Sequence, residues 1–184
     1  MGSLVMACFS VAAAGWLLGV VEMIAVAIFA PLAFRLGCVG ARVEDFTAAP
    51  VLLPPGFIGE TALAKFKMTD NAKCLFRRKF AFLNRRVLGP FEMKGTLEWG
   101  TGHFVATGRL PVGSMMFLVG WFGFFGVFMA TLAALPVLPP VLFGVVLVIV
   151  SLRSARRNFV DYVQQVSEAV TGQPQPTTTS LTPP

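Results

Sequence analysis

The sequence predicts an α-helical integral membrane protein with three transmembrane helices and a small cytoplasmic strand-rich (α+β) unit between the first and second spans. Of its 184 residues, 55% are hydrophobic and only 13% are charged, whereas a soluble domain carries about 25% charged residues. The charges avoid two stretches: residues 1–34 hold only Glu22, and residues 110–152 hold none. Between these stretches, apolar and polar residues alternate with the period of a β-strand.

Residues 1–34 are predicted to form the first transmembrane helix. A bilayer core needs about 20 apolar residues in a helix, and this stretch exceeds that length. A cleaved signal peptide is not expected, because residues 1–5 contain no basic side chain and the apolar stretch is too long for a signal-peptide core.

Residues 113–152 are predicted to form a transmembrane helical hairpin. Three prolines fall within residues 135–140, and a helix interior does not accommodate them, so two helices joined by a turn are expected. Pro140 suits the first turn of a helix, and nothing interrupts the helical pattern before Gly172. The third span therefore continues outside the membrane as an amphipathic helix over residues 153–172.

The basic residues predict the orientation. Twelve of the fifteen Lys and Arg residues lie within residues 35–109, and the other three are Arg153, Arg156 and Arg157. The positive-inside rule places the N-terminus outside and both the basic unit and the C-terminus in the cytoplasm. The expected location is the bacterial inner membrane.

Residues 61–112 are predicted to form a basic antiparallel β unit. Residues 91–99 and 103–110 alternate apolar and polar side chains around a glycine-containing turn at 100–102, the pattern of a β-hairpin. Ala64, Phe66 and Met68 alternate with lysines upstream, and a further alternating run begins at Cys74. Four strands in a meander are expected.

The apolar face of such a sheet needs a cover. One stripe of the 153–171 helix carries Phe159, Val163, Val166 and Val170, at helical spacing. Two interpretations stay open: the stripe packs on the sheet, or it docks on a partner.

Two proline-containing segments complete the chain. Residues 35–60 are interpreted as a juxtamembrane Pro-rich connection that skims the membrane surface or a partner. Residues 173–184 form a Pro/Thr-rich tail that is expected to be disordered on its own.

Glu22 and two rows of small residues are the candidate helix-packing sites. An unpaired carboxylate within a membrane is costly, so Glu22 needs a partner. It could make an interhelical hydrogen bond or contact another subunit, reach the membrane interface, or serve a proton relay. Small residues allow close helix approach. The candidate interface consists of Ala12, Gly15, Gly19 and Glu22 in the first span and Gly123, Gly126, Ala130 and Ala133 in the second.

A basic cluster is the candidate contact site for lipids or partners. It comprises six residues within fourteen positions: Lys73, Arg77, Arg78, Lys79, Arg85 and Arg86. Beside a membrane such a cluster attracts anionic lipid head groups or an acidic protein, and a purely topological role is the alternative. Nucleic acid is not an expected partner, since no recognition helix is apparent.

No pattern predicts catalysis or a cofactor. His103 is the only histidine, and Cys8, Cys38 and Cys74 lack metal-site or disulfide spacing. We expect no enzyme, no cofactor and no metal. The predicted function is a non-catalytic accessory or structural subunit of a larger integral-membrane complex, such as a respiratory or photosynthetic one, with other integral-membrane subunits as partners. The alternative is a self-standing membrane-anchored module that binds anionic lipid or an acidic protein through its basic β unit.

Overall fold

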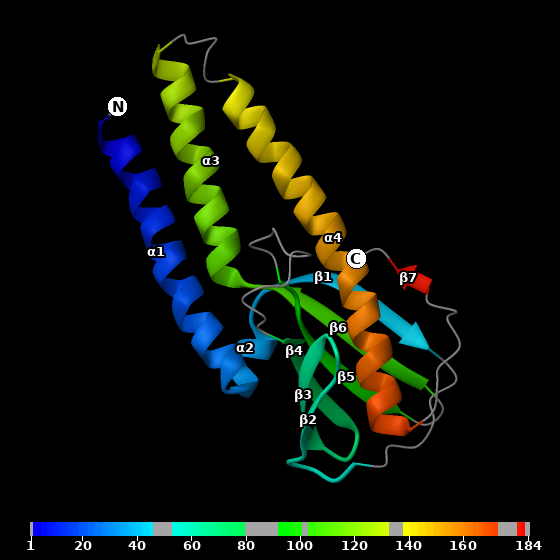
Figure 1. The fold of residues 1–184 in the computed structure, drawn as a ribbon. Helices are drawn as coiled ribbons and strands as arrows, with labels where there is room; N and C mark the ends of the chain where they lie inside the picture. Colours follow the sequence, from blue (N-terminus) through cyan, green and yellow to red (C-terminus); the bar gives the residue numbers. More distant parts are fainter. Residues whose placement is uncertain are drawn as a thin grey trace.

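A computed structural model describes residues 2–45, 53–79, 92–100, 103–132, 138–172 and 180–182. Its long helices extend to one side of a twisted antiparallel sheet (Figure 1). The helices are α1 (Gly2–Ala27), α2 (Pro31–Arg35), α3 (Val112–Leu132) and α4 (Leu138–Thr171). The strands are β1 (Cys38–Asp45), β2 (Ile58–Glu60), β3 (Ala64–Asp70), β4 (Lys73–Arg78), β5 (Lys94–Gly100), β6 (His103–Leu110) and β7 (Ser180–Thr182).

One helix in the described part of the chain, α1, is long and apolar enough to cross a membrane by its length and composition. In α3, the described apolar stretch Val112–Val127 is shorter than a membrane span requires. The prediction of three spans is thus supported for one helix. The predicted break between the second and third apolar helices falls on residues 133–137, which lie outside the described residues; α3 is described as far as Leu132 and α4 from Leu138.

The sheet has seven strands in the order β2-β3-β4-β5-β6-β1-β7, and each described pair is antiparallel. The predicted four-stranded meander is present as β3 to β6. The predicted hairpin is β5–β6, in which Gly100 pairs with His103. Thr101 and Gly102, at the tip of the predicted turn, lie outside the described residues.

Three strands were missed by the sequence patterns. Strands β1 and β2 lie within 35–60, which was interpreted as a connection, and β1 pairs with β6 along nearly its whole length. The alternation in β1 is weak, because only Ala41 and Val43 are buried apolar residues. The prediction that the tail is disordered is wrong for residues 180–182, which form β7 against β1. Edge pairing needs only backbone groups, so composition does not reveal it.

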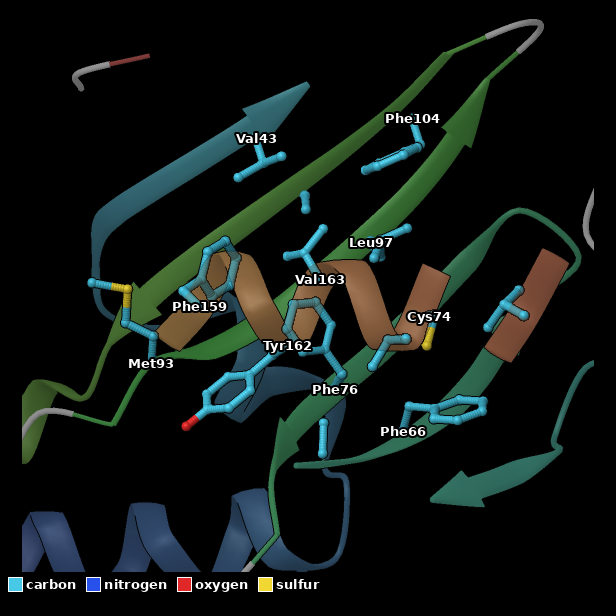
Figure 2. Close-up of a cluster of buried hydrophobic side chains, with 14 of the residues drawn as sticks. Val43, Phe66, Cys74, Phe76, Met93, Leu97, Phe104, Phe159, Tyr162 and Val163 are labelled. Atoms are coloured by element: carbon cyan, nitrogen blue, oxygen red, sulfur yellow. The ribbon is translucent and has the colours of Figure 1, made fainter. Parts of the chain in front are cut away.

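The second half of α4 covers one face of the sheet and closes the main core (Figures 1 and 2). All four residues of the predicted stripe are at most 2% exposed: Phe159, Val163, Val166 and Val170. Phe159 stacks on Phe76 of β4, with ring centres 5.5 Å apart. Of the two interpretations of the stripe, packing on the sheet is therefore the observed one.

Two glycines make room for this aromatic pair. Gly95 and Gly108 lie opposite each other across β5 and β6. A methyl group on Gly95 would overlap the Phe76 ring, and one on Gly108 would come within 2.7 Å of the Phe159 ring. The single interruption of the apolar pattern in β5, at Gly95, is thus a packing requirement of the core.

Among the described residues, the end of α1 and α2 cover one corner of the opposite face of the sheet. Phe29, Phe34 and Leu75 form a small second core there. Helix α4 ends as predicted, because Gly172 adopts a left-handed φ of 69° and donates its N–H to Glu168 O at 2.8 Å. The sheet thus lies between two helical elements, both of which continue into the apolar helices.

Candidate functional site at the junction of helices and sheet

Glu22 connects three elements of the fold. One carboxylate oxygen, Oε1, accepts a hydrogen bond from Nζ of Lys94 on β5. The other, Oε2, accepts the backbone N–H of Gly113 at 3.1 Å. The two charged side chains are 7% and 2% exposed, respectively. Glu22 therefore links α1 to the sheet and to the start of α3.

The charges of this pair offset each other where water is nearly excluded. Removing a carboxylate and an ammonium from water costs several kcal/mol per ion, so each needs its partner. Gly113 is the second residue of α3, and the N–H groups of a first helical turn lack partners within their own helix. The positive end of the α3 dipole also favours the Glu22 carboxylate. Of the three interpretations of Glu22, the described contacts match an interhelical hydrogen bond, with a lysine of the sheet added.

Helix α1 ends in a Schellman motif in which Phe29 takes the left-handed position. Ala30 N–H bonds to Ala25 O and Phe29 N–H to Val26 O, the hydrogen bonds of a Schellman motif. Phe29 occupies the left-handed position, with a φ of 56°, where glycine is usual. Such a backbone conformation costs a non-glycine residue of order 1 kcal/mol or more. Phe29 is held there by stacking on Phe34, with ring centres 6.0 Å apart.

Arg77 of β4 reaches this helix end. Its Nη2 donates to Ala27 O at 3.3 Å, its Nη1 donates to Arg78 O at 3.2 Å, and its guanidinium carbon lies 5.2 Å from the centre of the Phe29 ring. A cation at a helix C-terminus is favoured by the helix dipole. Burial lowers the pKa of Arg77, while Glu60 and Glu92 oppose that shift. Arg77 and Lys94 thus join two adjacent strands to the last turns of α1.

Helices α1 and α3 pack antiparallel through small residues. Methyl groups on Gly15 and Gly113 would overlap the backbone of the facing helix, and one on Gly120 would lie 2.7 Å from Ala12 Cα. Small side chains let the backbones approach this closely. The predicted residues Ala12, Gly15 and Gly19 of α1 all lie on this contact surface.

The predicted face of α3 is only partly the observed one. Gly123 faces Cys8, with its added methyl 3.1 Å from Cys8 Sγ, whereas a methyl on Gly126 would meet no described atom within 4 Å. The Ala130 side chain and all of Ala133 lie outside the described residues.

The α3 face in contact begins instead with Gly113 and Gly120, which the sequence patterns missed. A signal was present: Gly113 and Gly120 are seven residues apart, as are Ala12 and Gly19, and each pair spans two helical turns. Antiparallel pairing of equal spacings aligns both pairs at once.

The predicted basic cluster is divided by the structure. Lys73 lies at one end of β4 and pairs with Glu98. Arg78 lies at the other end, about 16 Å away at the rise of an extended strand, and pairs with Glu92 at 2.7 Å. Lys79 pairs with Glu60. Arg85 and Arg86 lie outside the described residues, so a continuous patch of six cations is not seen in the described part.

A cavity of about 480 Å³ opens beside Glu22 in the angle between α1, α3 and the sheet. We call it the junction pocket. It has an apolar wall on the two helices and charged groups beside the sheet. The apolar wall on the helices includes Trp16, Val20, Met23, Val26, Phe117 and Leu118, and the charged lining residues are Glu22, Arg77, Arg78, Glu92 and Lys94. An amphiphilic molecule matches this division.

The cysteines have three different surroundings. Cys38 is exposed, Cys8 packs on α3, and Cys74 is fully buried in the core. Burial raises the pKa of the Cys74 thiol to about 12. Within the described ranges, no three His, Cys, Asp or Glu side chains gather as metal ligands would.

Comparisons with protein families, with curated proteins and with solved structures found no significant match. The function must therefore be inferred from the geometry of the fold and of the junction.

Proposed function

We propose that this chain is a non-catalytic structural or accessory subunit of a larger integral-membrane complex, such as a respiratory or photosynthetic one. The distribution of exposed apolar side chains carries this proposal. Most large ones lie on α1, α3 and the first half of α4, including Phe9, Trp16, Trp121 and Phe143. The core of the sheet is covered by α4. A surface of this size needs lipid or a partner, so the contacts of the chain lie within the bilayer.

The proposal places α1, α3 and the apolar half of α4 in the membrane, with the N-terminus outside and the sheet in the cytoplasm. The 26 residues of α1 span about 39 Å and the 21 residues of α3 about 32 Å, against a hydrocarbon core of about 30 Å. The contacts of Glu22 and Arg77 with the sheet support an α1 that is retained rather than cleaved, because its removal would strand the buried Lys94.

Cys38 provides a test of this topology. It is the exposed cysteine at the start of β1, while Cys74 is buried and Cys8 packs between helices. A membrane-impermeant maleimide should label Cys38 in inverted inner-membrane vesicles and not in intact spheroplasts, and a Cys38→Ser variant is the control. Labelling in intact spheroplasts would overturn the orientation.

The polar groups of the junction are engaged in holding elements together. Glu22 and Lys94 could in principle exchange protons, but they pair with each other and with the start of α3. Arg78 and Glu92 likewise form an ion pair. This arrangement supports a structural role over a catalytic one.

Purification of the native chain from its own membranes in a mild detergent tests the subunit assignment. Mass spectrometry of the purified material should find a fixed set of larger membrane proteins in constant ratio to this chain. A chain that elutes alone or only with itself would refute the proposal. The alternative, a self-standing module with one broad basic surface, has less support because Lys73 is separated from Arg78 and Lys79.

A further inference from the structure

We propose that the junction pocket binds one anionic phospholipid, with the head group beside the sheet and the start of an acyl chain along α1 and α3. This inference rests on the proposed membrane embedding of the two helices. It concerns a defined site for one lipid molecule, which is different from general attraction of a basic surface to a membrane.

The shape and position of the pocket match a lipid. Its lining follows α1 from Gly15 to Val26, eleven residues or about 16 Å of helix. At one end lie Glu22 and Lys94, level with the beginning of α3, where the helices meet the sheet. At the other end lies Trp16, which is 61% exposed.

The charge of the lining favours an anion. Three cations, Arg77, Arg78 and Lys94, face two carboxylates, Glu22 and Glu92. Guanidinium groups present several N–H donors in one plane and bind phosphate oxygens well. The positive excess beside the sheet therefore selects a phosphate that carries a negative charge.

The apolar wall distinguishes a lipid from free phosphate. Val20, Met23, Phe117 and Leu118 line most of the distance between the charged end and Trp16. Inorganic phosphate would leave this wall uncovered, whereas an acyl chain would cover it and gain the free energy of apolar burial.

Native mass spectrometry of the full chain in mild detergent provides the test. The delipidated protein is mixed with dioleoylphosphatidylglycerol, with dioleoylphosphatidylcholine, or with inorganic phosphate. One phosphatidylglycerol should be retained, about five- to thirtyfold more than phosphatidylcholine, as expected for one or two effective cations near a head group. Equal retention of the two lipids, or retention of phosphate as readily as lipid, would overturn the proposal.

Two adjacent residues of α1 give a matched pair of variants for the apolar wall. Val20 lines the pocket, while Val21 is 62% exposed and does not line it. Val20→Trp should fill the pocket and reduce phosphatidylglycerol retention at least about fivefold. Val21→Trp adds the same indole outside it and should leave retention unchanged. The same retention in both variants would overturn the assignment to this pocket.

Arg77 gives an independent pair for the charged end. Arg77→Gln should abolish the preference for phosphatidylglycerol, and Arg77→Lys should keep most of it. Circular dichroism checks that each variant is folded. If Arg77→Gln does not fold, the comparison of Val20→Trp with Val21→Trp still tests the lipid site.

Failure of the lipid site and failure of the proposed function give different results. If α1 is not embedded, alkaline carbonate releases the chain from membranes, and the proposed function fails together with the lipid site. A chain that resists carbonate but shows no lipid preference overturns the lipid site alone.

Discussion

Replacing Lys94 with methionine tests whether the junction stabilises the whole molecule. The variant keeps an unbranched side chain of similar length but removes the cation that pairs with the Glu22 carboxylate, which keeps the Gly113 N–H as a partner. Breaking a buried ion pair from one side costs about 3–5 kcal/mol, because the remaining charge is still excluded from water. For a chain of this size, that loss corresponds to a decrease in Tm of about 6–20 °C.

A second ion pair of the same sheet supplies the control. Lys73 on β4 pairs with Glu98 on β5, and their side chains are 34% and 57% exposed. Solvent screens such a pair, so Lys73→Met should cost about 0.2–1 kcal/mol. The structure therefore predicts a difference of at least about 2 kcal/mol between two identical substitutions.

Thermal unfolding of the detergent-solubilised chain, followed by circular dichroism, measures both variants under one condition. The double variant Glu22→Gln, Lys94→Met should recover much of the lost Tm, since it leaves no buried charge while an amide oxygen can still accept the Gly113 N–H. The reasoning is refuted if Lys94→Met lowers the Tm no more than Lys73→Met, or if the double variant is less stable than Lys94→Met alone.

Three further predictions concern the helix contact and the core. Gly120→Ala should lower stability by about 1–3 kcal/mol through overlap with α1. Gly126→Ala, whose methyl meets no described atom within 4 Å, should change the Tm by less than about 2 °C in the same assay. In the folded chain, a thiol reagent should modify Cys38 rapidly and Cys74 only after unfolding, as peptide mapping by mass spectrometry would show; rapid labelling of Cys74 would contradict its burial. Because the folded chain keeps the Cys74 proton up to a pKa of about 12 while the unfolded chain loses it above about 9, the stability due to Cys74 is full below pH 9 and falls by about 1.4 kcal/mol per pH unit above it. The free energy of unfolding of Cys74→Ala, measured with denaturant, should lack this decline. The prediction is wrong if the unsubstituted chain and Cys74→Ala show the same dependence on pH above pH 9.

Local periodicity was sufficient to predict the elements whose own residues form the core. In strand β5 and in the second half of α4, apolar residues recur at the spacing that puts them on one face of the element. The predicted stripe of α4 is buried on the sheet. Strand β1 could not be found in this way. Its position is determined by backbone pairing with β6, a partner about sixty to seventy residues away in the sequence. Its own sequence offers only a short apolar alternation, Val39, Ala41 and Val43.

Only one side of the junction, Glu22, could be predicted from the sequence. The sequence shows that Glu22 needs a partner, but it places Lys94 on the polar side of a half-buried strand, where a lysine usually faces water. Lys94 is buried because α1 extends past the start of α3 and its last turns cover that corner of the sheet. Such a contact depends on how far one helix extends beyond another, which is a property of the assembled fold and not of either segment.

The helices that pack on the two faces of the sheet fix its orientation relative to the apolar helices. Helix α4 closes one face through Phe159, and the end of α1 covers a corner of the other face through Phe29 and its contacts with Arg77. Both helices continue into the apolar bundle, and α3 is joined to α1 through Glu22. Tilting the sheet would therefore expose apolar surface on one face and separate buried charges on the other. Either change costs several kcal/mol, so a partner that binds the apolar helices would also position the sheet.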